Sequence, residues 1–160
     1  MDTTRLRDAY GTLLDAAASV AARAEEALEP PDGGWDAARV LAHVALVAAA
    51  TLATAATVAA GAAATYDNRL SLEDWTISRV HARAGGNAGL RERIRRQGEA
   101  LCALGAVLSD AELDTAVPTL LLSAGEVLVD QPVPLRAVLT GLADDHLPRH
   151  TTQLLALPPG

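Results

Sequence analysis

The sequence has very few aromatic residues: Phe is absent, and aromatics together supply 2% of its 160 residues. A hydrophobic core must therefore be built from the small and aliphatic side chains among the 50% of positions that are hydrophobic. Small side chains let helices approach one another closely, and alanine has the highest intrinsic helix propensity. Because the length suits one domain, residues 1–160, this composition predicts a single-domain, all-α protein.

Lysine is also absent, so all 13 basic residues are arginine, and 20 acidic residues outnumber them. The net charge of −7 argues against a nucleic-acid partner, because phosphate binding needs clustered cations. The densest basic stretch, residues 91–96, contains Glu92 and is followed by Glu99, a pattern typical of a solvated helix face. We therefore expect no nucleic-acid interface.

The chain has one cysteine, Cys102. A single cysteine excludes an intrachain disulfide framework and a cysteine-based zinc site. The neighbouring Leu101, Leu104 and Leu108 predict that this thiol is a buried small hydrophobic group rather than a nucleophile.

The N-terminus begins an amphipathic helix and lacks the apolar stretch of a signal peptide, so we expect a cytoplasmic protein. Residues 44–66 carry no formal charge and are numerous enough to span a bilayer. This segment consists mainly of Ala and Thr, however, and Arg39 and His43 lie just inside the same predicted helix. We interpret it as a buried helix of a bundle and expect no membrane partner.

Hydrophobic periodicity predicts four long helices. We place them at Thr3–Leu28, from an Asp36 N-cap to about Gly61, at Asn87–Leu108 and at Leu135–Leu157. The connection between the second and third helices, residues 62–86, is too long for a simple turn, and we expect it to cover a pocket.

Two apolar runs, Pro118–Leu122 and Glu126–Val129, flank the glycine-containing turn Ser123–Gly125 and predict a small β-hairpin before the fourth helix. Within that fourth helix, Pro148 is expected to kink the helix or to disturb its hydrogen bonding.

Three histidines occupy positions where a helix bundle would place core leucines. His43 lies in the apolar stripe of the second helix, and His146 and His150 continue the stripe of the fourth. An imidazole in an apolar bundle is costly unless its nitrogens find partners. A pair at i, i+4 presents both rings on one face, so a third histidine from a facing helix completes a three-ligand metal site with an open coordination position.

The residues alone leave an alternative, in which each histidine is a separately satisfied core residue. Pro148 lies between His146 and His150 and loosens the i, i+4 geometry. The fourth histidine, His81, lies in a more polar stretch and is expected to be exposed rather than a ligand.

Three stretches carry a resemblance to a known family: Trp35 with Val40–Val44, Tyr66–Arg69, and Asp145–Leu154. In order and spacing they resemble the DinB/YfiT-like superfamily, in particular the N-terminal, metal-binding domain of mycothiol-dependent maleylpyruvate isomerases. The resemblance implies an up-down-down-up four-helix bundle that forms homodimers and binds a divalent metal, usually zinc or nickel. His43, His146 and His150 match the family's ligand positions.

The resemblance also implies an enzyme that uses a low-molecular-weight thiol, such as mycothiol, to attack a small electrophile or to isomerise a double bond. Neutral imidazoles leave a bound ion its full charge, so a coordinated thiol would ionise. Polar side chains expected near the pocket mouth are Tyr66, Asp67, Asn68, Arg69 and Arg149. The catalytic residues are not identified from the sequence.

Two other functions stay open at this point. The chain could be a non-catalytic bundle that binds a small molecule or a partner and keeps the histidines as a structural or relic site. It could also be a specialised biosynthetic enzyme that uses the bundle cavity to shape its substrate.

Asp144 and Asp145, which adjoin His146, are candidates for contacts to the ligand histidines.

Overall fold

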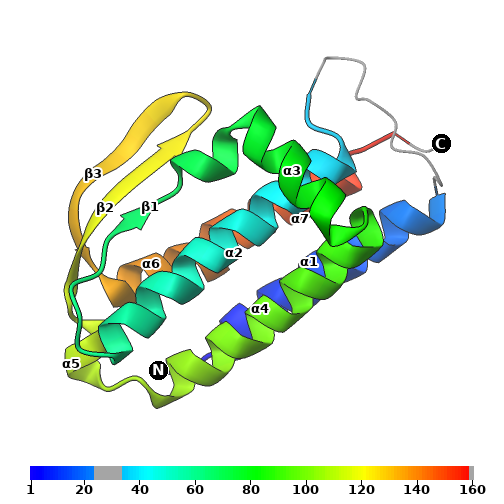
Figure 1. The fold of residues 1–160 in the computed structure, drawn as a ribbon. Helices are drawn as coiled ribbons and strands as arrows, with labels where there is room; N and C mark the ends of the chain where they lie inside the picture. The colour runs from blue at the N-terminus through cyan, green and yellow to red at the C-terminus, as the bar shows by residue number, and fades with distance from the viewer. Residues whose placement is uncertain (24–33, 159–160) are drawn as a thin grey trace.

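The computed structural model describes residues 1–23 and 34–158, and its long helices lie side by side (Figure 1). They are α1 (Thr4–Arg23), α2 (Ala37–Ala59), α4 (Asn87–Val107) and the segmented helix formed by α6 (Leu135–Gly141), η2 (Leu142–His146) and α7 (Leu147–Leu155). Helix α2 packs on α4, and α1 packs on both α4 and α7. The four predicted helices are thus present, although residues 24–28 of the first lie outside the described residues.

Helix α2 begins where the sequence predicts, because Asp36 caps it by accepting a hydrogen bond from the Arg39 N–H at 2.7 Å. This helix is long and apolar enough to cross a membrane by length and composition alone, but 61% of its most hydrophobic window is buried inside the protein. Its valines and alanines pack into the same core as Leu13, Ile94 and Leu101. A buried core helix passes the same test, so this feature assigns no membrane role.

The all-α expectation is not confirmed, because the mostly helical chain also forms a three-stranded sheet. The predicted hairpin is present and longer than expected, with β2 (Ala116–Ser123) antiparallel to β3 (Glu126–Pro134). The unexpected third strand, β1 (Tyr66–Asp67), runs parallel to β2. Directly after β1, the Asn68 side chain donates to the Leu122 carbonyl at 2.8 Å and accepts from its N–H at 2.9 Å, which holds the crossover against the hairpin.

After Asn68 the crossover is mostly helical. It contains a short 3-10 helix, η1 (Arg69–Leu72), and helix α3 (Asp74–Ala84), which ends at Gly85 with a φ of 79°. That positive φ favours glycine, since residues with a Cβ rarely adopt it. The crossover thereby places Ser71 and Leu72 against α2.

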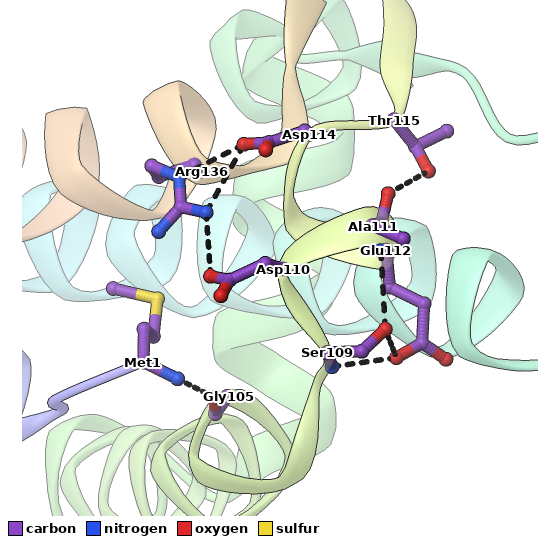
Figure 2. A network of polar contacts seen from close by, with 9 residues as sticks. All are labelled: Met1, Gly105, Ser109, Asp110, Ala111, Glu112, Asp114, Thr115 and Arg136. Carbon is purple, nitrogen blue, oxygen red and sulfur yellow. Dashed lines mark hydrogen bonds and ion pairs between the residues drawn. The ribbon is translucent and has the colours of Figure 1, made fainter.

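A short helix, α5 (Asp110–Leu113), connects α4 to the hairpin. Figure 2 shows its capping box, in which Ser109 and Glu112 bond each other's backbone N–H. Arg136 at the start of α6 forms ion pairs with Asp110 and Asp114, both at 3.0 Å. The Met1 ammonium donates to the Gly105 carbonyl at 2.9 Å. The Arg136 ion pairs tie α5 to the start of α6, and the Met1 contact ties the N-terminus of the chain to the end of α4.

The predicted disturbance around Pro148 is present as a π-helical segment, η2. Proline has no N–H to donate one turn back, and the Leu147 N–H instead bonds the carbonyl of Leu142, five residues earlier. The helix continues through this bulge without a loop, so His146 and His150 stay on adjoining turns.

Candidate metal centre

The structure brings three predicted site residues together. His43 comes from the second turn of α2, His146 from the end of η2 and His150 from α7. Their ring centroids lie 5.1 Å (His43 to His146), 4.8 Å (His43 to His150) and 4.6 Å (His146 to His150) apart. One potential ligand nitrogen from each ring lies within 4.8 Å of the others. The π-helical bulge therefore does not separate the pair, and the three rings could hold one ion.

Hydrogen bonds orient two of the rings. His43 Nδ1 lies 2.8 Å from the Ser71 carbonyl oxygen, and His150 Nδ1 lies 2.9 Å from Gln153 Oε1. Both partners are acceptors, so Nδ1 of each ring carries the proton and donates it. Nε2 of each ring is then left as the lone-pair nitrogen, which is the ligand form that such outer contacts select in metal sites.

The third ring lacks such a partner. His146 Nε2 is buried and has no hydrogen-bond partner among the described residues. A buried polar atom without a partner costs about 1–3 kcal/mol, so an orphan of this kind calls for an explanation. A cation held between the three rings would supply the missing partner, and the donor set therefore fits a divalent ion that accepts nitrogen ligands.

Burial keeps the three rings neutral. Desolvation is the main cause that lowers the pKa of His43 to about 4, and it lowers the pKa of His146 and His150 as well. The Arg149 guanidinium lowers all three pKa values further, since it disfavours a second positive charge nearby. Neutral imidazole is the form that binds metal ions.

The histidines line a cavity of about 650 Å³, here called the histidine cavity. It extends between the β2–β3 hairpin, α6 and the crossover, and Trp35 packs edge-on against His43 with ring centroids 5.0 Å apart. The predicted pocket residues Tyr66, Asn68 and Arg149 line this cavity.

Two predicted pocket residues have other positions. Asp67 and Arg69 are exposed, lie outside the lining of the cavity and form an ion pair at 2.6 Å. Arg149 does line the cavity, where its guanidinium pairs with Asp145 and donates to Ser123 Oγ at 3.2 Å. Of the four residues predicted at the pocket mouth, Tyr66–Arg69, two therefore line the cavity and two lie on the surface.

The carboxylates next to His146 do not orient the rings. Asp144 pairs with Arg5 at 3.2 Å and Asp145 pairs with Arg149. The contacts to the rings come instead from Ser71 and Gln153, neither of which the sequence singled out for this role. For Gln153 a signal existed, because it lies three residues after His150 on the same helix face. A backbone carbonyl such as that of Ser71 has no signature in the sequence.

His81 does not belong to the cluster and lines a separate groove with Asp36, Arg39 and Asn87. It is partly buried rather than exposed. Cys102 is buried on α4, as predicted, and lies outside the histidine cavity.

Comparisons with protein-family models, with curated proteins and with solved structures find no match to this chain. Functional assignment therefore rests on the geometry of the histidines and on the residues around them.

Proposed function

We propose that this chain binds one divalent ion, zinc or nickel, through His43, His146 and His150, and that it is a metal-dependent enzyme acting on a small electrophile with a low-molecular-weight thiol. The observation that carries the proposal is the convergence of three neutral imidazoles, one with a buried nitrogen that has no hydrogen-bond partner among the described residues. The resemblance to the DinB/YfiT-like superfamily supports it, because the same residues match that family's ligand positions.

When bound, such an ion supplies Lewis acidity and lowers the pKa of a coordinated thiol or water. The chain contributes the surroundings. Ser71 and Gln153 fix two ring orientations and tautomers, and burial keeps all three rings available as ligands. Trp35 packs edge-on against His43, and the hairpin forms an apolar wall of the histidine cavity. Within this proposal the reaction is thiol transfer or thiol-assisted isomerisation, mycothiol is the expected thiol, and the fold is an up-down-down-up bundle that forms homodimers.

The apolar cavity also favours a second candidate, a biosynthetic or binding protein that uses this space to hold a small molecule. A volume of about 650 Å³ lies within the range of small-molecule sites, roughly 300–1,000 Å³.

Metal analysis tests the proposed site. Protein purified without a metal-binding tag and incubated with zinc should contain one ion per chain after gel filtration. His43→Ala and His150→Ala should each lose tight binding, since two remaining imidazoles make a much weaker site. His81→Ala is the matched control and should bind zinc like the wild type. Stoichiometric zinc in a variant lacking all three cluster histidines would show that the site is elsewhere.

A further inference from the structure

The walls of the histidine cavity are apolar and only partly buried. The hairpin contributes Leu121, Leu122, Leu128, Val129 and Val133, and Val138 faces them from α6. Core leucines such as Leu13 and Leu101 are completely buried, whereas these side chains retain accessible surface. Protein interiors are close-packed, with few voids larger than a water molecule, so a space of this size beside aliphatic side chains suits a ligand rather than a core.

Polar side chains along this wall already have partners inside the protein. Both ends of the Asn68 amide bond Leu122, and the Thr119 hydroxyl donates to the Val117 carbonyl at 2.9 Å. Ser123 accepts from Arg149. A sugar or nucleotide body placed here would find few replacements for its many hydrogen bonds to water, which is costly. The wall therefore selects a hydrocarbon body.

The histidines favour a different part of a ligand, its polar head group. Arg149 and Asp145 are the charged side chains in the described lining, and their charges cancel. While the rings are neutral and free of metal, the Nε2 atoms of His43 and His150 are hydrogen-bond acceptors that suit a hydroxyl and repel a carboxylate. A divalent ion bound there would add two positive charges, and the preferred head group would become anionic.

We propose that the histidine cavity binds an amphiphile, with a hydrocarbon body against the β2–β3 hairpin and a single carboxylate at the histidines. The place of the carboxylate rests on the proposed function, because it requires a bound ion. Binding of the hydrocarbon body depends only on the cavity.

Trp35 provides the readout, since it lines the cavity, whereas Trp75 on α3 is 74% exposed. In a Trp75→Phe background, fluorescence titrations with the alcohols and carboxylates of six, eight and ten carbons report binding near Trp35. In metal-free protein, affinity for the alcohols should rise about fourfold per added methylene, the increment expected for burial of a CH₂ group. After zinc loading, decanoate should bind at least tenfold more tightly than decanol.

Two neighbouring hairpin residues give a matched pair of variants. Leu128 lines the cavity and Val127 does not, although both are more than half exposed, so an acidic residue should be tolerated at either site. Leu128→Asp should weaken decanol binding at least tenfold, and Val127→Asp should change it less than twofold. Far-ultraviolet circular dichroism of each variant verifies folding.

Affinity that does not depend on chain length in metal-free protein, or equal losses in both hairpin variants, overturns the hydrocarbon site. Zinc content measured on the same samples separates the two proposals. If zinc is stoichiometric and decanoate gains no advantage, the carboxylate assignment is overturned. If zinc does not bind while the alcohol series keeps its slope, the proposed function and the carboxylate position fail, and the hydrocarbon site is supported.

Discussion

At the α1–α4 interface the ring of Tyr10 lies so close to Gly98 that a Cβ on this glycine would be 2.8 Å from the ring, whereas around the histidines the chain leaves about 650 Å³ unfilled. Leu13, Ile94 and Leu101 are completely buried in the part of the core that includes this interface. The hairpin side chains at the histidine cavity are not. The two helices touch closely at Gly98, beside a groove of about 440 Å³ that Tyr10 and Gly98 also line, whereas the space at the histidines lies beside converging polar groups.

Both regions bury a polar atom without a hydrogen-bond partner among the described residues, namely the Tyr10 hydroxyl and His146 Nε2. In the part of the chain that the structure describes, the histidine, cysteine and carboxylate groups that converge closely enough to hold an ion are His146 and two further imidazoles, not residues at Tyr10. A buried polar atom without a hydrogen-bond partner therefore indicates a metal site only when other potential ligand atoms lie close to it.

The largest expected effect comes from breaking the close packing. Gly98→Ala places a methyl group against the ring of Tyr10, a residue that is 4% exposed, and should lower the free energy of unfolding by about 1–3 kcal/mol, the usual cost of overpacking. Urea denaturation monitored by circular dichroism measures it.

Gly11→Ala on α1 is the control, because a Cβ there meets nothing within 4 Å. Since alanine is the better helix former, this variant should be more stable than the wild type by about 0.5–1 kcal/mol. Equal effects of the two substitutions would contradict the close approach of α1 and α4.

A smaller effect concerns the two tyrosines, one from each region. Burial raises the pKa of Tyr10 and of Tyr66 above the ordinary value of 10.0. A phenol with a raised pKa stabilises the fold below pH 10, and this contribution is lost as the pH rises above that value. Absorbance at 295 nm should therefore show little phenolate near pH 10 in folded protein.

The variants Tyr10→Phe and Tyr66→Phe assign the signal to each ring. Each remaining phenol should titrate above pH 10 while circular dichroism still reports a folded chain. In urea the pKa of both phenols should return to the ordinary value. Normal titration of Tyr10 in the folded state would show that the α1–α4 interface is open to solvent.

The sequence predicted the helices and the histidine cluster better than the sheet. His43, His146 and His150 interrupt apolar stripes, and a stripe reports which face of a helix is buried. His146 and His150 stay on adjoining turns despite Pro148, because a π-helical bulge accommodates the missing proline N–H without breaking the helix. Such a bulge depends on how the helix packs, which a local pattern does not encode.

Strand β1 could not be predicted, because two residues give no periodicity and its pairing depends on Asn68 reaching Leu122, which lies 54 positions along the chain. The contact of the Ser71 carbonyl with His43 could not be predicted either, because it also joins residues far apart in the sequence. Asp67 and Arg69 were placed at the pocket on their polarity alone, and polarity does not distinguish a cavity wall from an exposed ion pair. Local patterns therefore identified the ligand candidates and missed the backbone groups that orient them.

The smallest expected effect is that of substituting Cys102. This substitution tests whether the reaction takes place at the histidines or at the thiol beside the α1–α4 interface. Its thiol is buried, and burial raises its pKa, so it is a poor nucleophile at neutral pH. If the proposed function is correct, metal removal by a chelator should stop addition of mycothiol, bacillithiol or glutathione to a bimane, an epoxide or an enone. Cys102→Ser should keep the rate within about twofold, because this residue does not line the histidine cavity. Activity that survives the chelator and is lost in Cys102→Ser would move the reactive centre to the α1–α4 region. No turnover with any of the three thiols would favour the binding or biosynthetic candidate over the thiol-dependent enzyme.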